Sequence, residues 1–131
     1  HDFEHFHSKI EVAKPLDKMT PEELKVYREH PINGSRRLQE KRHFDQTVLN
    51  IISQHEEFID GKGFPQGLTE SKTDPLAVIV ASANKVDRLL TFEGVHRNEI
   101  GKNLMIRYTG AHPLEHLKHL GDIINQFKLL L

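Results

Sequence analysis

The chain of 131 residues contains no cysteine, and its lysine and arginine side chains do not outnumber its acidic ones. Without cysteine there is no disulfide, no thiolate zinc site and no thiol nucleophile, so any bound metal ion must use nitrogen and oxygen ligands. The 18 basic and 19 acidic residues give a formal net charge of −1. This balance argues against DNA as a partner, because nucleic-acid binding relies on a surplus of cations.

Long apolar runs are also absent from the sequence. No stretch approaches the roughly 18 to 20 apolar residues that span a bilayer, and the first residues do not form a signal-peptide pattern. We therefore expect a cytoplasmic protein without a membrane partner. Hydrophobic residues make up 37% of the chain and charged residues 28%, a composition typical of globular proteins.

The length fits one domain over residues 1–131. Because the sequence begins at His1 rather than at methionine, we expect the C-terminal fragment of a longer chain that lacks its first helices.

Helix signals recur along the chain and strand signals are scarce, so we predict an all-α fold. Thr20-Pro21-Glu22-Glu23 is a capping box with proline at the first helical position, and its helix is expected to end near His30. Pro31 should break the helix, because the residue before proline is disfavoured in the α conformation. A short helix over residues 35–38 and another over residues 45–55, with Asp45 as the N-cap, should follow.

Residues 56–74 are predicted to form a long loop, and Asp74-Pro75 then restarts the helical pattern. The next segment is apolar almost all round and should be a central buried helix. A buried strand is the competing prediction, because Val78-Ile79-Val80 is rich in β-branched side chains. Glycines interrupt residues 91–110, where no long element is expected. From Pro113 a last helix carries one apolar stripe, formed by Leu114, Leu117, Leu120, Ile124, Phe127 and Leu131.

Ten histidines are an unusual number for a chain of this length. Four of them are expected at surfaces or helix ends, namely His96, His112, His116 and His119. The most informative histidine is His55, which ends an apolar helical pattern and should point inward. Acidic residues follow it directly, and a tight turn comes after them, formed by Gly61, Gly63 and Pro65.

The candidate metal ligands lie in separate predicted helices and would have to converge on folding. They are His1, Asp2, His30, His55, Glu56 and Asn84. Imidazole and carboxylate ligands suit divalent Fe, Mn or Zn, which neutralise phosphate charge during hydrolysis. The alternative is that these residues form hydrogen bonds between helices and hold no ion.

In order and spacing, these residues resemble the HD-GYP family, the branch of the HD phosphohydrolase superfamily associated with hydrolysis of cyclic di-GMP. The resemblance is colinear over about residues 1–92. His1-Asp2 falls at the family's His-Asp pair, residues 14–23 are similar to its Lys-Pro-Gly-Lys-Leu-Thr-Glu-Glu stretch, and residues 30–34 match its His-Pro-x-x-Gly. Residues 55–68 follow its His-His-Glu-x-x-Asp-Gly-x-Gly-Tyr-Pro-x-Gly-Leu motif, which is long and specific.

The resemblance implies an HD-domain-like bundle of about five to seven helices. It also implies a cyclic dinucleotide or a signalling protein as partner, and an upstream receiver or sensor domain. Catalytic or supporting positions would be His1, Asp2, Glu57 and Asp60. Substrate-binding positions would be His5, Gly61, Lys62, Gly63, Phe64 and Pro65.

The chain departs from the family pattern at positions that carry chemistry. His5 stands where the family has a phosphate-binding lysine, Glu56 where it has a second histidine, and Phe64 where it has tyrosine. Asn84 replaces a metal-bridging aspartate, and an amide offers only one neutral oxygen, so a centre with several metals should be weakened. We expect one divalent ion or none.

Two functions follow from this pattern. One is a catalytically degenerate regulatory or binding module with weak or no turnover, and the clustering of substitutions on chemical positions favours it. The alternative is an active metal-dependent phosphodiesterase acting on cyclic di-GMP or a related nucleotide.

Overall fold

The structure is a computed structural model that describes residues 1–127. These residues form six α-helices, and their only β-pairing consists of isolated bridges. The helices are α1 (His5–Ser8), α2 (Pro21–Gln39), α3 (Gln46–Gln54), α4 (Pro75–Asp87), α5 (Ile100–Tyr108) and α6 (Leu114–Phe127). Short 3-10 turns occur at Leu16–Lys18, Glu70–Lys72 and Arg97–Glu99, and a π-helical turn, Arg88–Phe92, extends α4. The predictions of an all-α fold and of the number of helices are confirmed.

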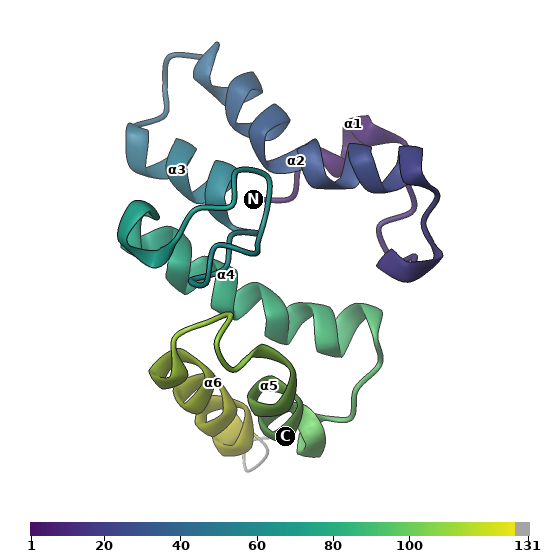
Figure 1. Cartoon of the computed structure of the whole chain (residues 1–131), viewed down its shortest axis with the longest axis vertical. Helices are drawn as coiled ribbons and strands as arrows, with labels where there is room; N and C mark the ends of the chain where they lie inside the picture. The colour runs from purple at the N-terminus through teal and green to yellow at the C-terminus, as the bar shows by residue number, and fades with distance from the viewer. Residues whose placement is uncertain (128–131) are drawn as a thin grey trace.

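Helix α4 crosses the middle of the molecule. Helices α2 and α3 pack together on one side of it, and α5 and α6 pack together on the other (Figure 1). The N-terminal segment with α1 lies along α2. None of the described helices is both long and apolar enough to cross a membrane.

Helix α2 corrects the predicted break at Pro31. The helix begins as expected, since the Glu23 N–H donates to the Thr20 hydroxyl at 3.2 Å and the Thr20 N–H donates to the Glu23 carboxylate at 2.8 Å. It then continues through Pro31, so the separate helix predicted over residues 35–38 is part of α2. Proline has no N–H to donate to the carbonyl of Tyr27, four residues earlier. The Nδ1 atom of His30 bonds that carbonyl instead, and a side chain thus satisfies the acceptor that the proline leaves free.

Helix α3 follows the prediction closely. The Val48 N–H donates to the Asp45 carboxylate at 3.0 Å, which makes Asp45 the N-cap, and His55 stands at the C-cap. Gly34 of α2 allows α3 to approach, because a Cβ added there would lie 3.3 Å from Ile52. The imidazole of His55 is completely buried, as its helical position predicts.

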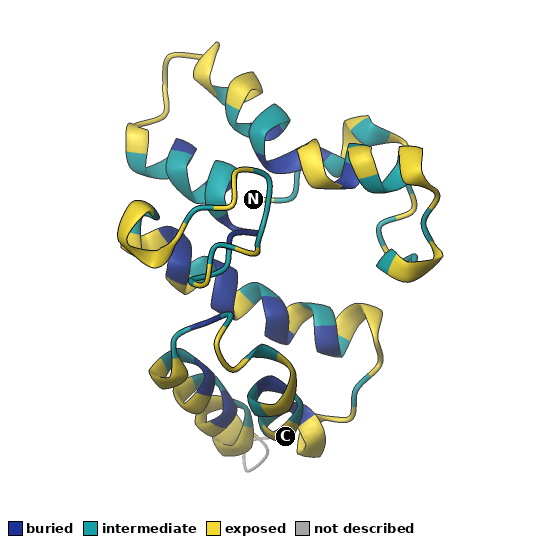
Figure 2. Ribbon diagram, in the orientation of Figure 1, coloured by how far each residue is buried: buried dark blue, intermediate teal, exposed yellow. Residues whose placement is uncertain are grey.

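Helix α4 is helical rather than extended, which excludes the competing strand, but it is not buried all round. Leu76 and Ile79 are 49% and 51% exposed. Its buried face continues through the π-helical turn into a core shared with α5 and α6, shown in dark blue in Figure 2. This core cluster consists of Val86, Leu89, Ile100, Leu104 and Leu117.

Helix α5 contradicts the prediction that residues 91–110 hold no long element. Gly101 lies inside the helix and faces Gly121 of α6, where an added Cβ would lie 3.3 Å from the Gly101 Cα. The glycine that resembled an interruption therefore permits close helix packing. The α6 stripe is buried at Leu117, while Leu114 and Phe127 are 44% and 53% exposed. Leu131 lies outside the described residues.

His112 was expected at a surface or a helix end; it lies two residues before α6 and is not at the surface, since it is only 2% exposed. Its ring packs edge-on against Phe58, and its Nδ1 lies 3.3 Å from the Ser82 hydroxyl, which also lies 3.0 Å from the half-buried ring of His116. Burial lowers the pKa of His112 to about 4. His96 and His119 are exposed, as predicted.

Candidate metal centre and adjoining cavity

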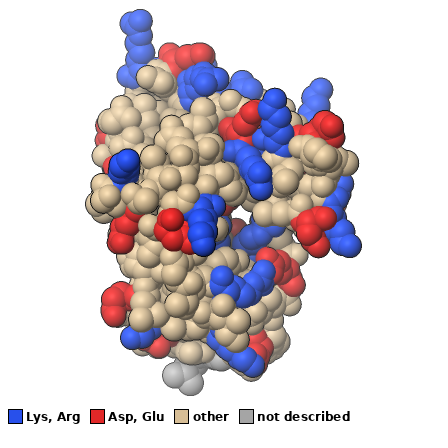
Figure 3. Space-filling view, in the orientation of Figure 1, with Lys and Arg blue, Asp and Glu red and all other residues tan. Residues whose placement is uncertain are grey.

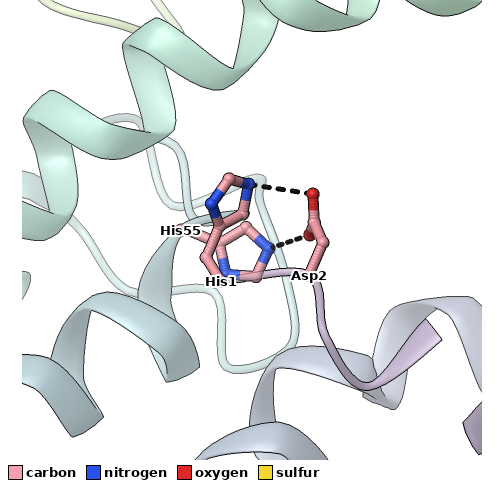
Figure 4. Close-up of side chains that lie close together, drawn as sticks. All are labelled: His1, Asp2 and His55. Atoms are coloured by element: carbon pink, nitrogen blue, oxygen red, sulfur yellow. Dashed lines mark hydrogen bonds and ion pairs between the residues drawn. The ribbon is translucent and has the colours of Figure 1, made fainter. Parts of the chain in front are cut away.

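Three separate segments bring imidazoles and one carboxylate to a common point. His1 and Asp2 precede α1, His30 lies inside α2, and His55 caps α3. One oxygen of Asp2, Oδ1, lies 3.0 Å from His55 Nε2 and 3.4 Å from His30 Nε2. The other, Oδ2, lies 2.8 Å from His1 Nε2. Figure 4 shows the Asp2 carboxylate facing His1 and His55 with its two oxygens.

The backbone fixes the tautomers of His30 and His55. The Nδ1 atom of His30 bonds the Tyr27 carbonyl, and that of His55 bonds the Ile52 carbonyl at 2.7 Å. A carbonyl only accepts, so each Nδ1 carries the ring proton and each neutral ring directs an Nε2 lone pair at the other. These Nε2 atoms are 3.0 Å apart and both face the Asp2 carboxylate. The two lone pairs and the negative carboxylate repel one another unless a proton or a metal ion lies between these atoms.

The spacing of these atoms fits a divalent metal ion. With bonds of about 2.1 Å, two ligands on one ion are about 3.0 Å apart at right angles and about 3.4 Å apart in a tetrahedron. The separations among Asp2 Oδ1, His30 Nε2 and His55 Nε2 are 3.0 to 3.4 Å. Metal-binding histidines also commonly donate their second ring N–H to a carbonyl. The donor set therefore suits Zn, Fe or Mn.

The pKa of Asp2 lies well below its ordinary value. Burial raises it, but the hydrogen bond from His1 and the imidazoles of His30 and His55 that face the carboxylate together outweigh burial. The pKa of His1 is raised, chiefly because its ring bonds the Asp2 carboxylate. Its Nε2 also lies 3.2 Å from Asn84 Oδ1, so in this arrangement His1 donates to two acceptors. Asp2 therefore stays ionised at neutral pH and supplies negative charge for a cation.

Glu56 adjoins the cluster, but its carboxylate is already engaged. It is 3% exposed and accepts from Lys85 Nζ at 2.9 Å, from the Tyr27 hydroxyl at 3.3 Å and from Asn84 Nδ2 at 3.4 Å. Lys85 is itself only 5% exposed. Burial raises the pKa of Glu56, yet Lys85 and the neighbouring imidazoles of His55 and His30 together hold the pKa below its ordinary value. Glu56 and Lys85 thus form a buried ion pair beside the imidazoles.

A cavity of about 620 Å³ adjoins the cluster and shares Glu56 with it. This size is typical of small-molecule sites. Three cations line the cavity, Lys85, Arg88 and Arg107, together with five aromatic side chains, Tyr27, Phe58, Phe64, Phe92 and Tyr108. Figure 3 shows the surface hollowed between the arm formed by α2 and the body that holds α4, with basic side chains along the edge.

Comparison with known proteins agrees with this architecture. The model of the HD domain family matches residues 7–100. The chain belongs to the HD domain family. It is similar to Bd1817, an HDG"Y"P protein from Bdellovibrio bacteriovorus, with 55% identity and a TM-score of 0.86 over 95% of this chain and 40% of that one. It is also 33% identical over 85 residues to the cyclic di-GMP phosphodiesterase PA4108 of Pseudomonas aeruginosa.

These similarities identify the chain as an HD-GYP-type domain, as its motifs predicted. The match to PA4108 covers 62% of this chain but 20% of that protein, so the domain corresponds to a minor part of both relatives.

In this HD-GYP-type domain the glycine loop is held by Glu57. The carboxylate of Glu57 accepts from the Gln66 N–H at 2.7 Å and from the Leu68 N–H at 2.8 Å, so both of its oxygens brace the loop. Asp60 is exposed and accepts from the Lys62 N–H at 3.0 Å in a local turn. A Cβ at Gly63 would lie 2.3 Å from the Phe58 nitrogen, so only glycine fits.

The predicted substrate-binding residues fall in different places. Phe64 lines the large cavity, whereas Lys62, Gly63 and Pro65 line a shallower groove of about 510 Å³ against α2, which Phe64 also borders. Gly61 has a φ of +77° and forms the turn itself. His5 lies beside His30, and burial lowers its pKa to about 4, so at neutral pH it does not carry the charge of the lysine it replaces.

The sequence analysis did not predict three residues that line the cavity, namely Lys85, Arg88 and Arg107. Arg88 donates to the Tyr27 hydroxyl at 3.2 Å, and Arg107 donates to Glu93 on the cavity wall. For Lys85 a signal existed, since it is one charged residue within an apolar helical run. A buried lysine requires a buried partner, and the acidic residues after His55 were the available ones.

Proposed function

We propose that this HD-GYP-type domain is a regulatory or binding module that holds one divalent metal ion and binds a cyclic dinucleotide of the cyclic di-GMP class, with slow or no turnover. The observation that carries the proposal is the convergence of Asp2, His30 and His55. Beside them lies Glu56, which lines a cavity that also holds cations and aromatic rings.

The metal ion would be held by Asp2, His30 and His55. A divalent ion at this position would neutralise phosphate charge and polarise a phosphodiester oxygen. Its placement at the cavity is supported by Glu56, which lies within ligand distance of His30 and His55 and also lines the cavity.

The cavity offers both kinds of contact that a cyclic dinucleotide requires. Aromatic rings stack on bases, and guanidinium groups bind phosphates with charge-assisted hydrogen bonds. Arg88 and Arg107 are both paired with Glu93, at 3.6 Å from Arg88 Nε and at 2.5 Å from Arg107 Nη1. A phosphate would compete with this carboxylate for the same donors. The similarity to PA4108, a cyclic di-GMP phosphodiesterase, supports the same class of ligand.

Slow turnover is supported by the state of Glu56 and Asn84. Lys85 occupies the Glu56 carboxylate, and Asn84 brings a neutral amide that bonds His1 and Glu56. Neither side chain is free to bind a second cation. A centre with one ion would share the charge of the reacting phosphate over fewer cations than a centre with two.

The second candidate is an active phosphodiesterase. It is favoured by the set of Asp2, His30 and His55, whose separations of 3.0 to 3.4 Å match those of ligands on one ion.

The two functions are separated by one experiment on metal-loaded protein. Cyclic di-GMP binding is measured by calorimetry, and hydrolysis by chromatography in added Mn²⁺ or Fe²⁺. Binding without turnover supports the regulatory module. Turnover that His55→Gln abolishes supports the phosphodiesterase, and absence of both binding and turnover contradicts both functions.

A further inference from the structure

His5 occupies an unusual position beside the cluster. Its side chain is 8% exposed, and its ring centroid lies 4.2 Å from that of His30 and 5.6 Å from that of Tyr27. Its buried Nδ1 atom has no hydrogen-bond partner among residues 1–127. Its Nε2 lies 4.0 Å from Asp2 Oδ1, which is too far for a hydrogen bond. A buried imidazole that bonds nothing contributes little to the fold through its polar atoms.

The position of His5 is nevertheless fixed by its neighbours in sequence. Glu4 is buried and accepts from Arg37 Nε of α2 at 2.5 Å. Gly34 of α2 receives Phe3 and Glu4 closely, since a Cβ there would lie 3.3 Å from the Phe3 ring. The short α1 segment is therefore anchored to α2, and the His5 ring is held against the centre.

The distances around His5 fit a place on the same metal ion. Ligand atoms of Asp2, His5 and His30 all lie within 4.8 Å of one another. With bonds of about 2.1 Å, two ligands on opposite sides of one ion are about 4.2 Å apart. The 4.0 Å between His5 Nε2 and Asp2 Oδ1 falls between this value and the shorter separations of neighbouring ligands.

We propose that His5 is a metal ligand, so that the ion is held by Asp2, His5, His30 and His55. This inference rests on the proposed function, because it requires that the domain binds a metal ion. Glu56 is excluded from the set because Lys85 holds its carboxylate.

The proposed set has chemical consequences. Three imidazoles and one carboxylate form a nitrogen-rich site, which prefers Zn²⁺, Fe²⁺ or Co²⁺ over Mg²⁺. His5 therefore serves the metal ion rather than a phosphate group, although it stands at the position of the family's lysine.

The first test uses metal affinity. The whole chain is stripped with a chelator and titrated with Zn²⁺ in competition with an indicator, for wild type and for three variants. His5→Gln should weaken Zn²⁺ binding at least tenfold. His7→Gln, an exposed histidine of the same short helix, should leave the affinity unchanged, and His55→Gln should abolish binding.

A second measurement uses the wild-type protein and so does not depend on the folding of a variant. With ¹⁵N-labelled histidine, addition of Zn²⁺ should shift the Nε2 resonance of His5 together with those of His30 and His55. The inference is overturned if the His5 resonance does not move or if His5→Gln binds Zn²⁺ with wild-type affinity. If His55→Gln still abolishes Zn²⁺ binding in that case, the proposed function remains intact. Absence of Zn²⁺ binding to wild type overturns both.

Discussion

Replacement of Lys85 by methionine should reveal how strongly the buried ion pair supports the domain. Methionine retains the apolar stem of lysine and removes the ammonium group that lies 2.9 Å from Glu56 Oε2. Glu56 is 3% exposed, so its carboxylate would remain buried with only the Tyr27 hydroxyl and the Asn84 amide as donors.

The expected cost of Lys85→Met is large. Removing one partner of a buried ion pair typically costs about 3 to 5 kcal/mol. For a domain of this size, about 4 °C of melting temperature is lost per kcal/mol, so the midpoint should fall by about 12 to 20 °C. Removing both partners costs much less than removing one. The double variant Lys85→Met/Glu56→Gln should therefore melt well above the single variant.

The difference in stability between Lys85→Met and wild type should depend on pH. In wild type the folded pKa of Glu56 is lowered, so its contribution is present above the unfolded value of 4.5 and is lost as pH falls through the folded pKa. In Lys85→Met, burial is the largest remaining influence on Glu56, and it raises the pKa. The variant should therefore regain stability relative to wild type as pH falls from 7 to 5.

The assay is thermal or urea unfolding followed by circular dichroism, in chelator so that metal binding does not contribute. The reasoning is refuted if Lys85→Met melts within about 3 °C of wild type, less than 1 kcal/mol at this size. It is also refuted if the double variant is no more stable than Lys85→Met.

Three further predictions concern the loop, the core and the cavity. Gly63→Ala should destabilise the domain by about 3 kcal/mol in urea unfolding, because its Cβ would meet backbone at 2.3 Å. Gly94 has a φ of +62° and lies in open space, so Gly94→Ala should cost only about 1 to 2 kcal/mol. Equal losses of stability in the two variants would contradict this explanation. The folded pKa of His112 is about 4 against 6.5 unfolded, so the unfolded chain binds more protons between these values. The free energy of unfolding should therefore fall by about 2 kcal/mol from pH 7 to pH 5. A His112→Asn variant whose free energy of unfolding depends on pH as steeply as that of wild type would rule this out. Replacing Arg88 and Arg107 by methionine should weaken cyclic di-GMP binding at least tenfold by calorimetry, while Arg97→Met, on an exposed turn outside the cavity, should leave it unchanged; equal affinities would remove the cavity from the proposal.

Features of the fold that depend on local sequence were predicted correctly. The Thr20 capping box, the Asp45 N-cap and the Asp74-Pro75 helix start each use hydrogen bonds within four residues, so the sequence around them is sufficient to indicate them. The inward direction of His55 follows from helix periodicity in the same way.

Features that depend on distant partners were missed. Helix α2 passes Pro31 because the His30 ring bonds the Tyr27 carbonyl, and no propensity rule contains that bond. Helix α5 contains Gly101 because Gly121 lies opposite it, twenty positions later. The pairing of Glu56 with Lys85 likewise joins residues 29 positions apart. The resemblance to a family was sufficient to locate the site in the sequence. It did not indicate Lys85, whose positive charge balances the buried carboxylate of Glu56.

The central claim is that Asp2 and the imidazoles around it form a centre for a single divalent ion. Its most direct test is the metal content of the purified chain, loaded with Zn²⁺ or Mn²⁺, freed of excess ion and analysed by mass spectrometry. We predict one ion per chain in wild type and none in His55→Gln. No bound ion in wild type, or two or more per chain, would contradict the account.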